Sequence, residues 1–491
     1  MTVATLARQE DGLSRREALL GGSLRLAVVA IAAGAFAGFP AVIWSQSSAQ
    51  QTPLPWSVIA LCWLLALGLA LLAWLSHRRT TAAVGVLMDR LPGSFVAALL
   101  VGLSMRLGVL LVLDPQPASD GATYLRLAQQ LAFEGRYGWD GGRAFWPPGL
   151  PLLLAPLVWL GLPQKLILLL FGTGCFVVAM YGVKALARGL QLGAAGALPP
   201  WLLAIWPTHV LCSALPEKEL LVLALMPWIA IFATRASAGS VQSALSAGAL
   251  LGFAVLVQPS LQLLPAVVFA GALVWSRTPL RAASAALLGT VAMAAVIGPW
   301  TARNLATLGA PVLVSSNGGD VLYRANNELA TGLFTPRGAV DLSHLAELEI
   351  DRRSKQLAFA WIEENPGRFV QLSAGKMLYF LGDSSYGAYA VFGRGGVEVD
   401  REIYLGIRLI SALPWLALWF VVLGHLLHVP LTARAGEAVA YGLLLLPLLY
   451  LTLIHSVFES GPKYHIPLLA IVFVFFAAVV GNYRKQGAKC N

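Results

Sequence analysis

The chain has 491 residues, of which 58% are hydrophobic and 12% are charged, and its formal net charge is +10. A typical soluble domain carries about 25% charged residues, so this composition excludes a water-soluble fold. The lysines and arginines stand mainly beside apolar runs, where they act as topology determinants, and we predict no nucleic-acid partner. The four cysteines show neither disulfide-type nor metal-type spacing.

Apolar runs of about 17–25 residues alternate with short charged clusters, as a hydrocarbon core about 30 Å thick requires of helices. Backbone groups inside lipid must be paired within their own segment, so these runs are predicted to be helices. Twelve predicted spans share this pattern: 24–44, 54–76, 93–113, 165–187, 197–214, 220–234, 241–257, 261–275, 282–300, 404–426, 438–455 and 466–480. The predicted fold class is an all-α polytopic membrane protein.

The first run follows Arg15 and Arg16, as in a secretory or twin-arginine signal. The run from Leu24 to Trp44 is longer than the apolar part of such a signal, and a second run follows at once. We therefore expect a retained first helix.

Basic residues follow every even-numbered span. They are Arg78, Arg79, Lys184, Arg188, Arg235, Arg277, Arg281, Arg434, Arg484 and Lys485. Since basic residues favour the cytoplasmic side, both chain ends are predicted to be cytoplasmic. Segment 147–162 is also apolar, but counting it as a span would reverse every later loop. Its four prolines and short length favour a helix on the outer side, lying in the interface or dipping into the bilayer.

Two long loops then face outward. The first covers 114–164 and the second 301–403, where helix-like stretches at 342–362 and 369–381 predict a small helical cap. The expected organisation is two N-terminal helices (1–92), a core with the first outer loop (93–300), the cap (301–403), and C-terminal helices with a basic tail (404–491).

An amphipathic helix is predicted in the first loop, lying along the membrane interface. Its apolar positions recur at helical spacing: Tyr124, Leu125, Ala128, Leu131 and Ala132. Asp120 stands at its start. A carboxylate there acts as a helix N-cap or as a catalytic base, and the two roles are compatible.

Several short motifs follow one another in a fixed order. They are RLGVLLVL at the end of the third span, SDGATY, Gly135 and Trp146-Pro147-Pro148 in the first loop, ALPEKELL before the sixth span, the stretch 298–332, and GPKYHIP at 461–467. Together they resemble the GT-C superfamily of membrane glycosyltransferases, in particular bacterial protein-O-mannosyltransferase-like enzymes and the aminoarabinose transferase of lipid A. The resemblance covers about 93–480 and leaves the first two spans as an N-terminal addition.

The resemblance implies a GT-C-type helix bundle with interfacial helices, in the inner membrane of a bacterium. Its activity would be transfer of a sugar from a polyprenyl-phosphate donor to an extracytoplasmic glycan, lipid or protein acceptor, in cell-envelope glycan synthesis. Asp120 would be the general base. Glu217 matches the family's second acidic position, where it would orient the acceptor, bind a divalent ion with Asp120, or cap the sixth span.

A leaving phosphate needs cations near it. Lys463 and His465 are the first candidates, followed by Lys218, Arg303 and Arg324. For Lys463 the alternative is a lysine that extends to the membrane interface.

The candidate substrate contacts are Tyr124, Asn326, Asn327 and Tyr464, with a simple turn as the alternative for the two asparagines. Arg106 lies within a span, and it is predicted to extend to the membrane interface, to be paired, or to line the groove for the carrier lipid.

Some GT-C relatives use a metal, but no tight His/Asp cluster occurs in this sequence. We therefore predict metal-independent transfer without a cofactor. The alternatives are a transporter or flippase of lipid-linked sugar, an oligosaccharide ligase or polymerase, and a non-catalytic assembly subunit. Against a transporter, paired broken helices in matching halves are missing from the sequence.

Overall fold

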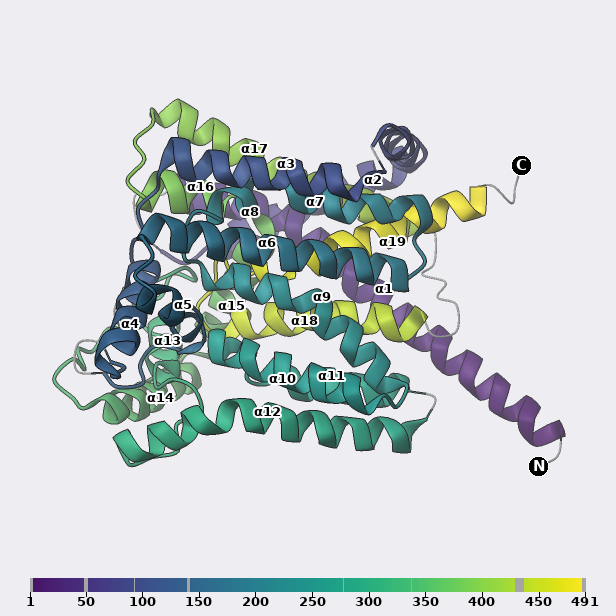
Figure 1. Cartoon of the computed structure of the whole chain (residues 1–491). Helices are drawn as coiled ribbons and strands as arrows, with labels where there is room; N and C mark the ends of the chain where they lie inside the picture. The colour runs from purple at the N-terminus through teal and green to yellow at the C-terminus, as the bar shows by residue number, and fades with distance from the viewer. Residues whose placement is uncertain are drawn as a thin grey trace.

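The computed structural model describes residues 3–47, 52–91, 93–138, 142–276, 278–336, 338–428 and 437–487. Within these ranges, the side chains at 3–21, 46–47, 275, 437–440 and 482–487 are not described. The elements of the described chain are helices, most of which run side by side along a common direction (Figure 1).

Among the described residues, seven helices are long and apolar enough to cross a membrane. They are α1 (Val3–Ser47, apolar over Gly22–Ser45), α2 (Trp56–Arg90), α3 with its π-helical end η1 (Phe95–Gly108 and Val109–Leu113), α6 (Gln164–Gly189), α9 (Lys218–Ser237), α12 (Pro279–Leu308) and α17 (Arg401–His428).

Shorter apolar helices complete the bundle. They are η2 with α7 (Gly193–Ala197 and Leu198–Ile205), followed by α8 (Pro207–Cys212), α10 (Val241–Val257), η3 with α11 (Pro259–Leu261 and Leu264–Trp275), α18 (Glu437–Val457) and η5 with α19 (Ile466–Leu468 and Leu469–Gly487). Each of the twelve predicted spans thus coincides with helical structure. The prediction of an all-α polytopic membrane protein is confirmed.

The outward faces of the bundle are apolar. In α2 only 22% of the most apolar stretch is buried within the protein, and Leu64 and Leu67 are exposed. Lipid is the solvent in which such a surface is stable. The helix also runs further than predicted, so that Arg78 and Arg79 lie on α2 and not in a loop after it.

The predicted span 197–214 is broken between α7 and α8. Pro207 has no N–H to donate to the carbonyl of Leu203, and Trp206 is extended at the break. Arg106 of α3 satisfies the freed groups: its guanidinium donates to the carbonyls of Leu203 and Ala204, each at 3.0 Å, and contacts Nδ1 of His209. The intramembrane arginine is therefore paired and stabilises the broken helix.

Four helices gather at one end of the bundle, opposite the end where α1 begins and α19 ends (Figure 1). They are α4 (Asp120–Glu134), α5 (Gly149–Trp159), α13 (Gly318–Ala325) and α14 (Glu347–Glu364). The placement of α5 agrees with leaving 147–162 out of the bundle. The end that faces the cytoplasm is predicted from the distribution of basic residues. Of these, Arg277 and Arg434 lie outside the described residues, and the side chains of Arg484 and Lys485 are not described.

The segment 301–403, predicted to be the second outer loop, enters the bundle instead of only covering it. Its helix α15 (Pro366–Gly382) packs along α1 and α18, before α16 (Tyr386–Ala388) and the π-helical η4 (Tyr389–Arg394) lead to α17. Gly38 of α1 and Gly382 are so close that a Cβ on either would overlap the other's backbone. Small residues permit such close approach between membrane helices. The N-terminal helix α1 is thus an integral part of the fold.

Candidate functional site

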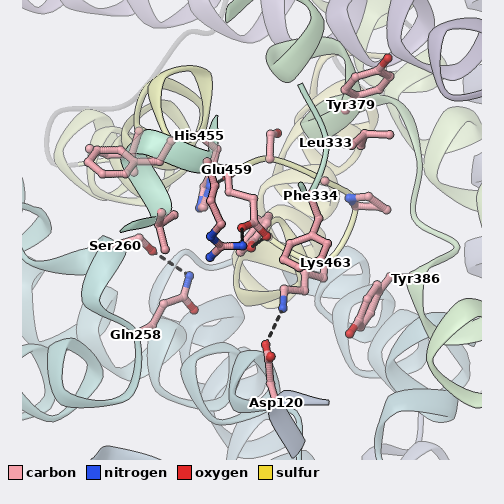
Figure 2. Close-up of a pocket in the computed structure, with 18 of the residues that line it drawn as sticks. Asp120, Gln258, Ser260, Leu333, Phe334, Tyr379, Tyr386, His455, Glu459 and Lys463 are labelled. Carbon is pink, nitrogen blue, oxygen red and sulfur yellow. Dashed lines mark hydrogen bonds and ion pairs between the residues drawn. The ribbon is translucent and has the colours of Figure 1, made fainter. Parts of the chain in front are cut away.

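A cavity of about 860 Å³ lies between the helices at the loop-bearing end and the adjoining ends of the bundle helices. Elements far apart in sequence contribute to its wall: α1, α4, α9, η3, α13, α15, α16, η4, α17, α18 and the segment 461–464. Figure 2 shows side chains from several of them directed toward the same space.

Asp120 faces Lys463 in this cavity (Figure 2). Nζ of Lys463 donates to Oδ2 of Asp120 at 3.0 Å, and the hydroxyl of Ser119 donates to Oδ1 at 3.3 Å. The N-cap position of α4 is Ser119, with φ of +51°, so Asp120 is the first helical residue and does not act as the cap. Its carboxylate is directed to the cavity instead.

The Lys463 ammonium holds the pKa of Asp120 well below the usual range of a carboxyl group, and Lys218 and Arg394 lower it further. Burial acts in the opposite direction but is outweighed. Asp120 is therefore an anion at every physiological pH. A carboxylate held in this way is a weak base for as long as Lys463 remains paired with it.

Two further cations near Asp120 are unpaired. Lys218 is the first residue of α9, with Nζ 5.8 Å from the centroid of the Tyr124 ring, and Arg394 ends η4, 5.7 Å from the ring of Tyr389. Within the described chain neither forms a salt bridge or hydrogen bond. Both line the cavity, so this part of the wall has positive charge available to an anionic ligand.

The other cavity-lining arginines already have carboxylate partners. Arg408 lies 2.9 Å from Asp383, and Arg324 lies 2.9 Å from Asp320 and 3.7 Å from Glu459. Their charge is largely neutralised within the protein.

Glu217 lies in the turn before α9, just behind the wall. Its Oε1 accepts a hydrogen bond at 3.0 Å from the hydroxyl of Tyr386, which lines the cavity, and its side chain forms no capping hydrogen bond with α9. Burial raises the pKa of Glu217 to about 7, with a further contribution from the neighbouring Glu219. The site thus holds two acids with opposite shifts.

The cavity unites only part of the predicted site. The predicted residues that line it are Asp120, Tyr124, Lys218, Arg324, Lys463 and Tyr464. Tyr124 is buried against Trp146, and its hydroxyl has no partner in the described chain. Tyr464 donates to Oε1 of Glu459 at 2.6 Å.

Four other predicted residues lie outside the cavity, and their side chains form hydrogen bonds with backbone carbonyl groups. His465 is buried, with Nδ1 2.9 Å from the carbonyl of Phe380 and its ring stacked on Trp415. Arg303 donates to the carbonyls of Arg143 and Tyr137. The amides of Asn326 and Asn327 donate to carbonyls at the end of α13, and that of Asn326 donates also to Val457 of α18.

Several cavity residues are not among the predicted ones: Gln258, Tyr386, Arg394, Arg408 and His455. Arg408 and His455 lie within predicted spans, and an ionisable residue in such a run is by itself a signal of function. Arg394 and Gln258 stand at the edges of apolar runs, where polar residues are common, and carry no comparable signal.

No group of three or more metal-ligating side chains suited to an ion occurs among the described residues.

No protein-family model matches the chain, and no curated protein matches its sequence. Among solved structures, the chain is similar to the archaeal oligosaccharyltransferase AglB from Archaeoglobus fulgidus, in complex with an inhibitory peptide and a dolichol-phosphate, at 12% identity and a TM-score of 0.44. That match covers 80% of this chain and 52% of AglB, so the chain spans about half the length of that protein.

The chain is also similar to ArnT from Cupriavidus metallidurans. For ArnT bound to undecaprenyl phosphate the identity is 16% and the TM-score 0.37, over 79% of this chain and 76% of that one. For its apo state the values are 17% and 0.36, over 82% and 78%. Both proteins are of the kind that the sequence motifs resemble. The fold and the cavity define a polytopic helical membrane protein with a cation-lined cavity at one end of its bundle.

Proposed function

We propose that the chain is a membrane glycosyltransferase that moves a hexose or pentose from a polyprenyl-phosphate donor to a hydroxyl of a glycan, lipid or protein acceptor. One observation carries the proposal: anionic Asp120 shares a cavity with Lys463 and with Lys218 and Arg394, which have no salt bridge or hydrogen bond in the described chain. A base beside a cluster of cations is what sugar transfer from a lipid phosphate requires.

The donor phosphate would lie among Lys463, Lys218 and Arg394. Three cationic donors there stabilise the charge that builds up on the phosphate as its bond to the sugar breaks. Because Lys463 also holds Asp120, an arriving phosphate competes with the carboxylate for the same ammonium. Donor binding would thereby raise the pKa of Asp120 toward its ordinary value and make it a better base.

The chemical step is a displacement at the anomeric carbon. The bond from this carbon to the phosphate oxygen breaks, a bond to the acceptor oxygen forms, and the acceptor proton passes to Asp120. Polyprenyl phosphate leaves with the electron pair of the broken bond. Glu217 would act through Tyr386: it accepts the hydrogen bond of the Tyr386 hydroxyl, which would leave the tyrosine oxygen to accept a hydrogen bond from the acceptor.

The proposed setting is the inner membrane of a bacterium, with both chain ends in the cytoplasm and the cavity at the outer face. The lysines and arginines that follow each even-numbered predicted span support this orientation. Membrane lipids would surround the bundle, and the donor's prenyl chain would extend between its helices.

Two measurements test the proposal. Mass spectrometry of lipid that co-purifies with the chain is expected to find a polyprenyl phosphate, with or without its sugar. Proteoliposomes that hold the chain, the identified donor and membrane extract as acceptor source are expected to form a product heavier by one sugar. Movement of the lipid-linked sugar across sealed vesicles with no change in glycan mass would contradict the proposal and indicate a transporter.

A further inference from the structure

A second part of the cavity wall holds two uncharged polar side chains, next to the ion pair of Arg324 and Glu459. They are Gln258 at the end of α10 and His455 in the last turn of α18 (Figure 2). These side chains are only 2% and 3% exposed, so both were removed from water on folding. Each nevertheless has a polar atom without a partner in the described chain. A buried polar atom of this kind is costly unless a ligand or water satisfies it.

The unpartnered atom of Gln258 is an acceptor. Its amide nitrogen donates to the hydroxyl of Ser260 at 3.0 Å, which fixes the orientation of the side chain. The carbonyl oxygen Oε1 is the atom left without a partner.

His455 also presents an acceptor. Its Nδ1 lies 2.6 Å from the backbone carbonyl of Glu459, and since a carbonyl only accepts, Nδ1 carries the proton. In the neutral ring, Nε2 is then an unprotonated acceptor, and it has no partner in the described chain. The ring is held between Phe380 and Tyr464, both stacked on it.

The two acceptors belong to one rigid wall. The Tyr450 hydroxyl, one turn before His455 on α18, donates to the carbonyl of Ser260 at 2.6 Å and accepts from the N–H of Leu263 at 3.3 Å. This wall continues directly into the phosphate-facing side of the cavity, because Tyr464, stacked on His455, is the neighbour of Lys463 in the chain.

We propose that Gln258 and His455 form the subsite that binds the transferred sugar, each accepting a hydrogen bond from an O–H or N–H group on its ring. The inference rests on the proposed function, since it places the sugar beside the phosphate held at Lys463. Two acceptors fixed in space select the positions of two donors on the ring. The wall would therefore select which sugar-charged lipid binds as the donor.

The test compares binding of undecaprenyl phosphate with binding of the same lipid charged with mannose or with aminoarabinose, in detergent, to the full chain. Wild type is expected to bind at least one charged lipid more tightly than the sugar-free lipid. Gln258→Leu keeps the approximate size of the side chain, and His455→Phe keeps an aromatic ring. Each is expected to lower the affinity for that charged lipid about tenfold. Binding of undecaprenyl phosphate is expected to stay as in wild type, which also shows that each variant is folded.

Gln242→Leu, on the exposed start of α10, and His344→Asn, in the exposed second loop, are the matched controls and should leave both affinities unchanged. The inference is overturned if Gln258→Leu and His455→Phe both keep the preference for the charged lipid, or if they weaken binding of the sugar-free lipid by the same factor. It is also overturned if wild type binds neither charged lipid more tightly than the sugar-free lipid. If wild type fails to bind undecaprenyl phosphate itself, the proposed function fails together with the inference.

Discussion

Nζ of Lys463 lies 3.0 Å from Oδ2 of Asp120, across 343 residues of sequence. The ion pair joins the start of α4 to the segment before α19, and both of its residues line the cavity. It also pairs Asp120, the proposed base, with Lys463, one of the cations proposed to bind the donor phosphate. The two proposed roles are therefore linked, and binding of the donor phosphate would alter the basicity of Asp120 toward the acceptor.

Asp120→Asn is expected to lower the rate of sugar transfer by a factor of about 10²–10⁴, because the amide cannot take the acceptor proton. Binding of undecaprenyl phosphate should persist or become tighter, since Lys463 is released from its carboxylate partner. Transfer assays and lipid binding on the same preparation measure both effects. Asp114→Asn is the control in the same loop, because Asp114 forms only an exposed ion pair with Lys165. Full transfer activity in Asp120→Asn would rule out this base.

Lys218→Met and Arg394→Met should each weaken undecaprenyl phosphate binding about 10- to 100-fold, the loss expected for one hydrogen bond to a charged group. Neither cation forms a salt bridge or a hydrogen bond in the described chain, so its removal should leave the melting temperature nearly unchanged. Lys165→Met, which removes an exposed lysine outside the cavity, serves as the control. Unchanged lipid affinity in both variants would place the phosphate elsewhere.

Arg106→Met is expected to destabilise the fold by about 3–5 kcal/mol, because it leaves buried carbonyls of Leu203 and Ala204 without a donor. Arg106→Lys should recover only part of this loss, since one ammonium cannot reproduce the fork that reaches both carbonyls. Thermal unfolding in detergent measures the effect, with exposed Arg188→Met as the control. A melting temperature equal to that of wild type would show that the break at Pro207 does not depend on Arg106.

Stability should depend on pH through Glu217. Its pKa in the folded chain, about 7, lies above the ordinary value, so the folded state binds this proton more tightly than the unfolded state. The group's contribution to stability is then fully present below the ordinary carboxyl pKa and is lost as pH rises toward 7. Glu217→Gln stays neutral, so relative to wild type it should gain about 1–3 kcal/mol between pH 5 and pH 8.

The exposed Glu134→Gln should show no such gain, because Glu134 pairs with Arg136 at the surface. A constant difference in melting temperature between wild type and Glu217→Gln across this pH range would contradict the raised pKa. Asp120 should contribute no change in this range, because its pKa lies far below it.

The membrane helices were predictable from the sequence because the requirement for them is local. A run long enough to cross the bilayer, made of apolar residues, is visible without knowing its neighbours. Asp120, Lys218 and Lys463 were also predictable as candidate site residues. Each stands at the edge of such a run, in a motif that resembles those of GT-C glycosyltransferases. The break at Pro207 is a local signal as well, although the predicted span passed over it.

Tertiary structure alone decided what these side chains do. Arg303, Asn326, Asn327 and His465 have the right chemistry for a phosphate or sugar, yet packing has directed them to backbone carbonyls. Which cations stay free, and which polar atoms remain buried without a partner, depends on distances between segments hundreds of residues apart. The sequence by itself determined that Asp120 stands at the mouth of a membrane bundle. Only the packing of α4 against the segment before α19 decided that Lys463 holds it, because charge interactions depend on separation in space and not along the chain.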